Sequence, residues 1–307
     1  MGCVVPVGFG PFKPEAWLVD AVVAGGGRVG DVDGAEVLVW TDPGEAAALD
    51  AALVAHPGIR WVQLPWAGIE RQVDVVREHP DRIWTCGKGV YALPVAELAL
   101  ALLLAGLRGL GTYARATTWE GSLGQNLVGA NVVIVGGGGI TASLLRLLGP
   151  FGCDVTVVRR RAEPLEGASR MLTLEDLDDA LAGADAAVLA LALTQHTVGL
   201  IDRRRLDLLG ERSWLVNIAR GRHVVTDDLV AALRAGTVGG AGLDVTDPEP
   251  LPDGHPLWTF PNVLITPHAG STPEMAVPLL ANRVTENLRR WGAGDPLLGL
   301  IDLAAGY

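Results

Sequence analysis

The sequence predicts an α/β protein made of two doubly wound parallel-sheet domains with a cleft between them. Two observations predict this class. Short apolar runs typical of strands alternate with helical patterns along most of the chain, which is typical of parallel β-α units. The 307 residues are also too many for one ordinary hydrophobic core and enough for two.

The first ninety residues form the first β-α series. Its short β-branched and apolar runs are expected to be strands, and the longer stretches between them helices. The expected strands are 4–7, 36–40 and 61–64, and the expected helices are 14–23 and 45–55. A long apolar helix is expected next, from about Pro94 to Arg115.

A second series contains six β-like runs with helical patterns between them, which predicts a doubly wound sheet. The expected strands are 131–135, 154–158, 186–193, 214–218, 240–245 and 263–266. A last helix, from about Pro273 to Trp291, is expected to pack back on the first domain. The first domain is therefore predicted to be discontinuous, with residues 1–96 and 275–307, and the second to span 97–274.

Composition excludes several classes of protein. A net charge of −11 argues against a nucleic-acid-binding protein, which needs a basic face. Cys3, Cys86 and Cys153 lie far apart with no C-x-x-C pair, so we expect no metal site and reduced thiols in a cytoplasmic protein. The most apolar run, 98–107, has ten residues where a membrane span needs about 20. No signal-peptide pattern is present, and no membrane association is expected.

A glycine-rich turn lies between the apolar strand 131–135 and a helical run. Glycines at such a turn let the backbone approach a pyrophosphate, which the helix N-terminus attracts. The pattern predicts a Rossmann-like dinucleotide site at Gly136, Gly138, Gly139 and Ile140. Thr141 replaces the third glycine of the fingerprint, and we expect it to loosen the match without touching the phosphate turn. The alternative interpretation is a flexible loop.

Three polar groups follow later strands and would meet at the carboxyl edge of the sheet. Arg220 ends Asn217-Ile218-Ala219-Arg220, and its guanidinium suits a carboxylate in bidentate fashion. Glu249 lies in an acidic segment, and His268 precedes a Gly-Ser-Thr turn. The alternatives are a surface arginine, a solvated acidic loop and a structural histidine. The remaining histidines are expected in loop-like or surface-like stretches: His56, His79, His196, His223 and His255.

Taken together and in order, these motifs resemble the D-isomer-specific 2-hydroxyacid dehydrogenases, which reduce 2-keto acids with a nicotinamide dinucleotide. The likeness extends from Trp61 onward, and the first sixty residues match only in pattern. It also rests on segments 64–69, 89–97, 193–201 and 255–258. The resemblance makes the first domain the substrate domain and the second the dinucleotide-binding domain.

The resemblance implies that Arg220, Glu249 and His268 are the catalytic residues. His268 would be the general acid, Glu249 would hold its ring and favour the protonated form, and Arg220 would bind the substrate carboxylate and polarise the carbonyl. Ala67 and Gly68 would bind the other side of the carboxylate through backbone N–H groups. Trp66 and Tyr91 would line the substrate pocket. The further residues implied at the cofactor are Thr194, Ile218, Ala219, Asp244 and Gly270, with Asp244 near the nicotinamide rather than acting as the acid.

The cofactor is expected to be NADP(H), with NAD(H) possible. NAD-binding proteins place a carboxylate after the second strand to hold the ribose 2′-hydroxyl. Here the strand 154–158 is followed by Arg159, Arg160 and Arg161. Arg159 and Arg160 are the expected contacts to a 2′-phosphate, with Arg161 facing solvent. The alternative is a solvated arginine-rich turn.

The predicted activity is that of an NAD(P)-dependent D-2-hydroxyacid dehydrogenase, similar to glyoxylate/hydroxypyruvate reductases, acting on a small 2-keto acid. Formate dehydrogenase, a relative with Gln at the position of Glu249, is disfavoured. Two other readings stay open: a dinucleotide-sensing corepressor-like binding protein, and a cofactor-binding relic with poor turnover because of Thr141. Trp66 could shrink the pocket for glyoxylate, stack on an aromatic keto acid, or pack between the domains.

The protein is also expected to form a homodimer. Relatives of the family pair through the cofactor domain and its hinge helix, and the run 98–107 is apolar nearly all the way round. The alternative is that this helix lies fully inside a two-domain monomer.

Overall fold

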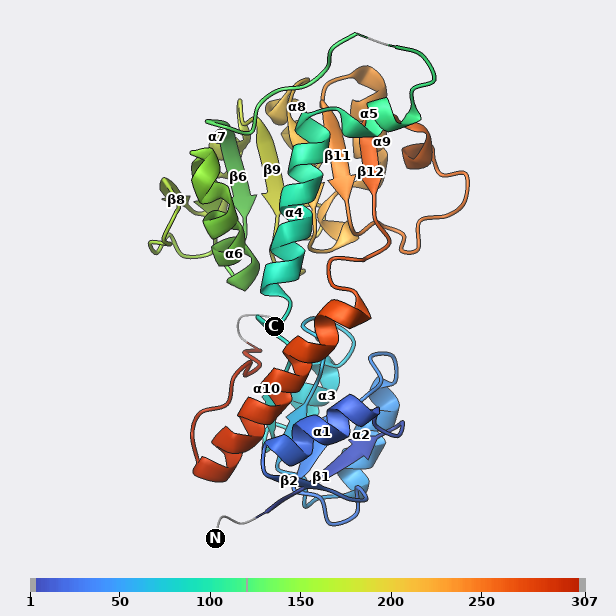
Figure 1. Ribbon diagram of the computed structural model, residues 1–307, viewed down its shortest axis with the longest axis vertical. Helices are drawn as coiled ribbons and strands as arrows, with labels where there is room; N and C mark the ends of the chain where they lie inside the picture. Colours follow the sequence, from blue (N-terminus) through green and yellow to red (C-terminus); the bar gives the residue numbers. More distant parts are fainter. Residues whose placement is uncertain (1–3, 120, 304–307) are drawn as a thin grey trace. The chain divides into compact units, whose positions relative to one another are not determined.

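The computed structural model describes residues 4–119 and 121–303, and the chain divides into two compact units. The first unit comprises residues 1–91 and 272–307, and the second comprises residues 92–271. Each unit contains one sheet in which every strand pairing is parallel, with helices on its faces (Figure 1). The predicted fold class, α/β with two Rossmann-like doubly wound domains, is confirmed.

The first unit has a five-stranded sheet in the order β2-β1-β3-β4-β5. Strand β2 is added on one side of β1, and β3, β4 and β5 are added in turn on the other side. This reversal is typical of a doubly wound sheet. The strands are β1 (Val5–Gly10), β2 (Gly27–Val29), β3 (Val37–Trp40), β4 (Trp61–Gln63) and β5 (Ile83–Thr85). The helices are α1 (Ala16–Ala24), α2 (Ala46–Ala55), α3 (Val73–Glu78) and α10 (Pro273–Ala293).

Successive side chains of β3 enter two different cores because strand side chains alternate between faces. Val37 and Val39 join a cluster with α1 and α10, whereas Leu38 and Trp40 join one with α2 and α3. Helix α10 follows the whole second unit in sequence yet belongs to the first. It is tied to α1 by a hydrogen bond from the Thr285 hydroxyl to the Ala21 carbonyl, 2.9 Å long.

The second unit has a seven-stranded sheet in the order β12-β11-β10-β9-β6-β7-β8. The direction of strand addition reverses between β6 and β9. The strands are β6 (Asn131–Val135), β7 (Asp154–Val158), β8 (Arg170–Leu172), β9 (Ala186–Leu189), β10 (Trp214–Asn217), β11 (Gly240–Leu243) and β12 (Val263–Ile265). The helices are α4 (Ala92–Leu107), α5 (Leu110–Arg115), α6 (Gly139–Leu148), α7 (Leu177–Leu181), α8 (Arg203–Leu209) and α9 (Thr226–Ala235).

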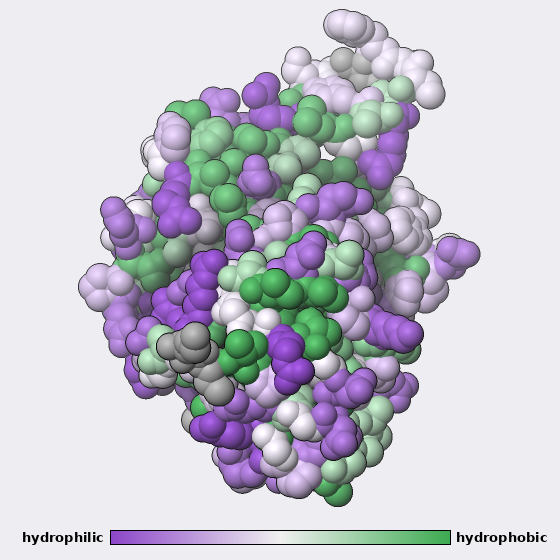
Figure 2. All heavy atoms as spheres, turned by 60° about the horizontal axis from the view of Figure 1, so that its bottom comes forward, coloured by the Kyte–Doolittle hydropathy of each residue, from purple (hydrophilic) through white to green (hydrophobic). Residues whose placement is uncertain are grey.

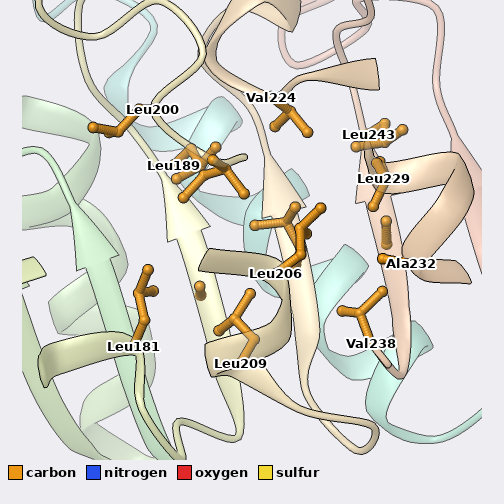
Figure 3. Packing of buried hydrophobic residues seen from close by; sticks show 14 of the residues in the cluster. Leu181, Leu189, Leu200, Leu206, Leu209, Val224, Leu229, Ala232, Val238 and Leu243 are labelled. Carbon is orange, nitrogen blue, oxygen red and sulfur yellow. The ribbon is translucent and has the colours of Figure 1, made fainter. Parts of the chain in front are cut away.

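Both faces of this sheet are covered by helices, so its central strands are mostly apolar and buried, as β9 is throughout. Leucines, valines and alanines of α7, α8 and α9 pack on one face, as Figure 3 shows around β9, β10 and β11. Helices α4 and α6 cover the other face. There the Trp214 ring fits only because two glycines flank it: an added Cβ would lie 1.9 Å from the ring at Gly106 and 2.0 Å from it at Gly240.

Several elements differ from the sequence-based expectation. The predicted helix from Pro94 to Arg115 is wrong as one element, because it breaks between α4 and α5 at Gly109, whose φ is +63°. Strands β2, β5 and β8 were not predicted. Each has three residues, too few to show a period, and β2 begins with glycine, which weakens a strand pattern.

The surface of the described residues is mixed, with hydrophobic patches between hydrophilic side chains on the face that Figure 2 presents. Trp119 is fully exposed, at 102% of its reference area. Cys86 and Cys153 are free thiols, and burial raises the pKa of both, whereas Cys3 lies outside the described residues. None of the helices in the described ranges combines the length and the apolar character needed to cross a membrane.

Candidate active site

The predicted site residues of the second unit gather at one edge of its sheet. Because all its strands are parallel, their carboxyl ends lie along the same edge, where doubly wound folds bind ligands. The glycine-rich turn follows β6, and Arg159 follows β7. Arg220, Asp244 and His268 follow β10, β11 and β12, respectively.

The glycine-rich turn has the backbone that the fingerprint requires. Gly136 has a φ of +116°, and a Cβ there would lie 2.1 Å from the Ala190 carbonyl oxygen, so only glycine fits between β6 and β9. Gly138 is the N-cap of α6 and supplies no capping side chain, and Gly139 and Ile140 open the helix. The positive end of the helix dipole is therefore available to an anion.

Thr141 does touch the phosphate turn, so the expectation that it would not is wrong. Its side chain is fully buried, and its hydroxyl donates a 2.9 Å hydrogen bond to the Gly136 carbonyl. A hydroxyl in the first turn of α6 thereby braces the turn that precedes the helix. Glycine at this position would allow closer helix–strand packing but could not make this bond.

Arg159 lies against the same turn. A Cβ on Gly137 would lie 2.6 Å from the Arg159 Cδ and 2.8 Å from its Nε, so the arginine stem crosses the turn where Gly137 has no side chain. The Arg159 side chain is 25% exposed, and Arg160 and Arg161 are exposed. No carboxylate directly follows β7. These residues fit a dinucleotide: glycines for the pyrophosphate, a helix N-terminus, and cations where the ribose 2′-substituent is expected.

His268 and Glu249 form a hydrogen-bonded pair. The His268 Nδ1 lies 2.7 Å from the Glu249 Oε1, and both side chains are about half exposed. With Nδ1 donating to the carboxylate, Nε2 is the ring nitrogen left to exchange a proton with a ligand. The pair is thus arranged as an oriented general acid or base beside the sheet edge.

The backbone around His268 is held by Asp244. Among residues 4–119 and 121–303, His268 is the only non-glycine residue with a positive φ, 53°. Its N–H donates to the Asp244 carbonyl at 2.8 Å. The buried Asp244 carboxylate accepts hydrogen bonds from the Thr266 hydroxyl at 2.6 Å and from the N–H groups of Ala269 and Gly270 at 2.7 and 3.0 Å. Asp244 therefore positions the loop that carries His268.

Arg220 sits in a turn built by two residues that the sequence analysis did not single out for this role. The buried Asn217 donates from Nδ2 to the Arg220 carbonyl at 2.8 Å and accepts from the Ala219 N–H at 3.1 Å. Gly221 is needed because a Cβ there would lie 1.9 Å from the Thr246 carbonyl oxygen. An asparagine that ends a buried strand is the signal that could have identified this turn.

Other predicted cofactor residues lie at the same edge. Ile218 and Ala219 are buried after β10, and the Thr194 N–H donates to the Thr197 hydroxyl at 2.8 Å. The expectation that His223 is surface-like is wrong. It is fully buried, with its Nδ1 2.9 Å from the Thr197 carbonyl oxygen, because it joins the turn after Arg220 to the Thr194–Thr197 loop.

The first unit brings its own predicted residues together. The Tyr91 hydroxyl donates to the Pro65 carbonyl at 2.7 Å, and burial raises the pKa of Tyr91 to about 12, so it serves as a fixed donor. Trp66 packs against the hydrophobic cluster of this unit, with Ala67 exposed and Gly68 half-buried beside it. Arg283, which the sequence did not suggest, donates to the Cys86 and Lys88 carbonyls and secures the segment that leads to Tyr91.

Comparisons with known proteins agree with this geometry. Residues 99–270 match the model of the D-isomer specific 2-hydroxyacid dehydrogenase NAD-binding domain. The chain is 35% identical to an uncharacterized protein in the proB 3′ region of Corynebacterium melassecola, covering 96% of this chain and 98% of that protein. It is 30% identical to glyoxylate/hydroxypyruvate reductase A of Yersinia enterocolitica, covering 91% and 90%.

A solved structure is similar over nearly the full length. The D-isomer specific 2-hydroxyacid dehydrogenase of Xanthobacter autotrophicus, in complex with NADPH and MES, is 30% identical with a TM-score of 0.85, covering 99% of both chains. The chain therefore belongs to the D-isomer-specific 2-hydroxyacid dehydrogenase family. The prediction of an NAD(P)-dependent oxidoreductase acting on the CH–OH group of 2-hydroxy acids is confirmed at this level.

Proposed function

We propose that this member of the family reduces a small 2-keto acid, of the glyoxylate or hydroxypyruvate kind, to the D-2-hydroxy acid, with NADP(H) preferred and NAD(H) accepted. The observation that carries the proposal is the 2.7 Å His268–Glu249 pair, which lies at the same sheet edge as Arg220 and the glycine-rich turn. The free thiols of Cys86 and Cys153 suit a reducing compartment, and we place the enzyme in the cytoplasm.

The proposed chemistry follows from the residue types. A reduced nicotinamide bound at the glycine-rich turn would supply the hydride that the keto carbon needs. His268, oriented by Glu249, donates the proton from Nε2 to the carbonyl oxygen as negative charge develops there. Arg220 binds the substrate carboxylate through its guanidinium and stabilises the same developing charge. In the reverse direction, the neutral His268 accepts the hydroxyl proton.

The remaining predicted residues take supporting roles in this proposal. Gly136, Gly138, Gly139 and Ile140 hold the pyrophosphate, and Arg159 and Arg160 hold the 2′-phosphate. Thr194, Ile218, Ala219, Asp244 and Gly270 shape the rest of the dinucleotide site, with Asp244 acting mainly through the His268 loop. From the first unit, Ala67 and Gly68 bind the substrate carboxylate through N–H groups, and Trp66 and Tyr91 set the room for its side chain.

Purified protein is expected to oxidise NADPH when glyoxylate or hydroxypyruvate is added, because the pair and Arg220 need only the 2-keto acid group. Initial rates at 340 nm with NADPH and with NADH, each with a panel of 2-keto acids of increasing size, measure both preferences. We expect kcat/KM to be at least about tenfold higher with NADPH, the effect of one charge-assisted contact of about 1.4 kcal/mol.

A tenfold preference for NADH would show that the arginines after β7 point away from the ribose. Binding of NADPH without turnover of any keto acid would favour the dinucleotide-sensing alternative. Lactate-sized, branched and aromatic keto acids complete the panel, because they report on the space beside Trp66 and Tyr91.

We also propose that the protein is a homodimer that pairs through its second unit. Helix α4 packs on the sheet, and its residues Leu98, Leu100 and Leu104, which are only partly buried against the same core, are apolar as well. The coil after α5, green in Figure 1, carries the fully exposed Trp119 and the half-exposed Leu123. Exposed aromatic and aliphatic side chains of this kind are typical of subunit interfaces.

Sedimentation equilibrium at micromolar concentrations is expected to give a particle of twice the 32.1 kDa chain mass. Trp119→Ser should shift the equilibrium toward monomer, because it removes the most exposed aromatic side chain of the described residues. Trp258→Ser, at a 47% exposed tryptophan elsewhere on the unit, is the matched control. A single 32 kDa species for the wild type across this range would refute the dimer.

A further inference from the structure

We propose that Glu163 sets the cofactor selectivity by competing with the 2′-phosphate of NADP(H) for the arginines that follow β7. This inference rests on the proposed function, because it assumes that Arg159 is the 2′-phosphate contact. Glu163 is neither a catalytic residue nor part of the glycine fingerprint. It acts in the free protein, where its carboxylate takes the place that the phosphate needs.

The geometry places one carboxylate between two guanidinium groups. The Glu163 Oε2 lies 3.7 Å from the Arg159 Nη2, and its Oε1 lies 3.9 Å from the Arg161 Nη1. Both distances are longer than a charge-assisted hydrogen bond, so the carboxylate is shared rather than bound by either arginine. The Arg161 side chain is 72% exposed, so its part of this arrangement lies at the surface.

The stem of Arg159 lies across the glycine-rich turn. It crosses Gly137 so closely that a Cβ there would overlap its Cδ and Nε, and its N–H donates to the Leu172 carbonyl at 3.0 Å. Its guanidinium therefore lies beside the phosphate turn, and Glu163 is the carboxylate that pairs with it among the described residues. Glu163 itself is 59% exposed and can swing into solvent.

The difference in charge between the 2′-phosphate and the Glu163 carboxylate determines which of them binds the arginines. A ribose phosphate carries about −1.5 to −2 charges at neutral pH and several acceptor oxygens, against a single charge on the carboxylate. The phosphate therefore displaces Glu163, but it must break two weak ion pairs and approach a like charge. NAD(H) has no phosphate at this position, so its binding neither breaks the two ion pairs nor brings a second negative charge close to Glu163. Glu163 consequently lowers the affinity for NADP(H). It thereby reduces the difference between the affinities for NADP(H) and NAD(H).

The test is isothermal titration of NADP⁺, NAD⁺, 2′,5′-ADP and 5′-AMP into the purified full-length protein. In Glu163→Gln we expect NADP⁺ and 2′,5′-ADP to bind about two- to fivefold more tightly, the effect of losing exposed competing ion pairs. NAD⁺ and 5′-AMP should bind as in the wild type. The gain should shrink as salt is raised, since the competing charges are exposed.

Two controls separate this role from a general charge effect. Glu166→Gln removes an exposed carboxylate three residues further on, for which the structure gives no ion pair with the described residues, and should leave all four affinities unchanged. Arg159→Gln should abolish most of the preference for NADP⁺. Adding Glu163→Gln to the Arg159→Gln variant should then increase the NADP⁺ affinity less than Glu163→Gln does in the wild type, because the carboxylate acts through that arginine.

The outcomes are distinguishable. Unchanged NADP⁺ affinity in Glu163→Gln, with a wild type that prefers NADP⁺ through Arg159, overturns this inference and leaves the proposed cofactor intact. Weaker NAD⁺ binding in Glu163→Gln also overturns it, because Glu163 would then hold the ribose hydroxyl. A wild type that does not prefer NADP⁺ contradicts the proposed cofactor preference itself.

Discussion

Replacing His268 with alanine is expected to lower kcat for 2-keto acid reduction by about 10²- to 10⁴-fold, the usual contribution of a positioned general acid. The proton would then have to come from the solvent instead of a positioned side chain. The Kd of NADP⁺ should change little, because the phosphate turn lies after β6 and His268 lies after β12, with three strands between them in the sheet order. Initial rates and titration calorimetry on the same preparation measure the two effects.

The matched control is His56→Ala, a histidine of the first unit that contacts Asp33 only at 3.9 Å and should retain wild-type rates. The kcat of Glu249→Gln should lie between the kcat of His268→Ala and that of the wild type. The glutamine can still accept from Nδ1 but carries no charge to stabilise the imidazolium that forms during hydroxy acid oxidation. Near-normal turnover of His268→Ala would show that His268 is not the general acid and that another group donates the proton.

Much of this arrangement could be predicted from the sequence because it depends on local patterns. The run 131–135 followed by Gly136 predicts a strand, a tight turn and a helix N-terminus, and the structure has all three. The positions of Arg220, Glu249 and His268 after successive strand-like runs also predict their shared edge, since parallel strands end on the same side of a sheet.

The bonds that hold these groups could not be predicted from pattern, because they join segments far apart in sequence. Asp244 organises the turn at His268 through the N–H groups of Ala269 and Gly270, about 25 residues away. A carboxylate that is buried with three donors is indistinguishable in sequence from one in a solvated acidic loop. The hydroxyl bond from Thr141 to Gly136 is local, but it depends on how α6 leaves the turn, which the residue pattern does not show.

Short strands were missed for a related reason. The three residues Arg170, Met171 and Leu172 become β8 only because β7 offers its free edge, with Thr156 opposite Arg170 in the register. Pairing of this kind is a tertiary effect, and three residues carry too little periodicity to reveal it. Strand β8 matters for the candidate site because the Leu172 carbonyl at its end accepts a hydrogen bond from the Arg159 N–H.

Arg220→Ala is expected to lower kcat/KM by about 10³-fold or more. Loss of charge-assisted bonds to the substrate carboxylate raises KM, and loss of charge stabilisation at the carbonyl lowers kcat by about 10²-fold. The variant loses the bond from the Arg220 Nη1 to the Ala219 carbonyl, 2.7 Å long, but the bonds from Asn217 and the close approach at Gly221 do not involve the guanidinium and should keep the turn. Thermal melting and NADP⁺ titration of the variant check that the fold and the dinucleotide site remain.

Arg220→Lys separates charge from geometry, because lysine keeps the charge but loses the planar fork that grips a carboxylate with two parallel bonds. We expect it to recover part of kcat while KM stays high. Arg222→Ala, at an exposed arginine two residues away, is the matched control and should show wild-type kinetics. If Arg220→Ala kept the wild-type KM for glyoxylate, the substrate carboxylate would have to be bound elsewhere, and the backbone N–H groups of Ala67 and Gly68 would be the next candidates to test.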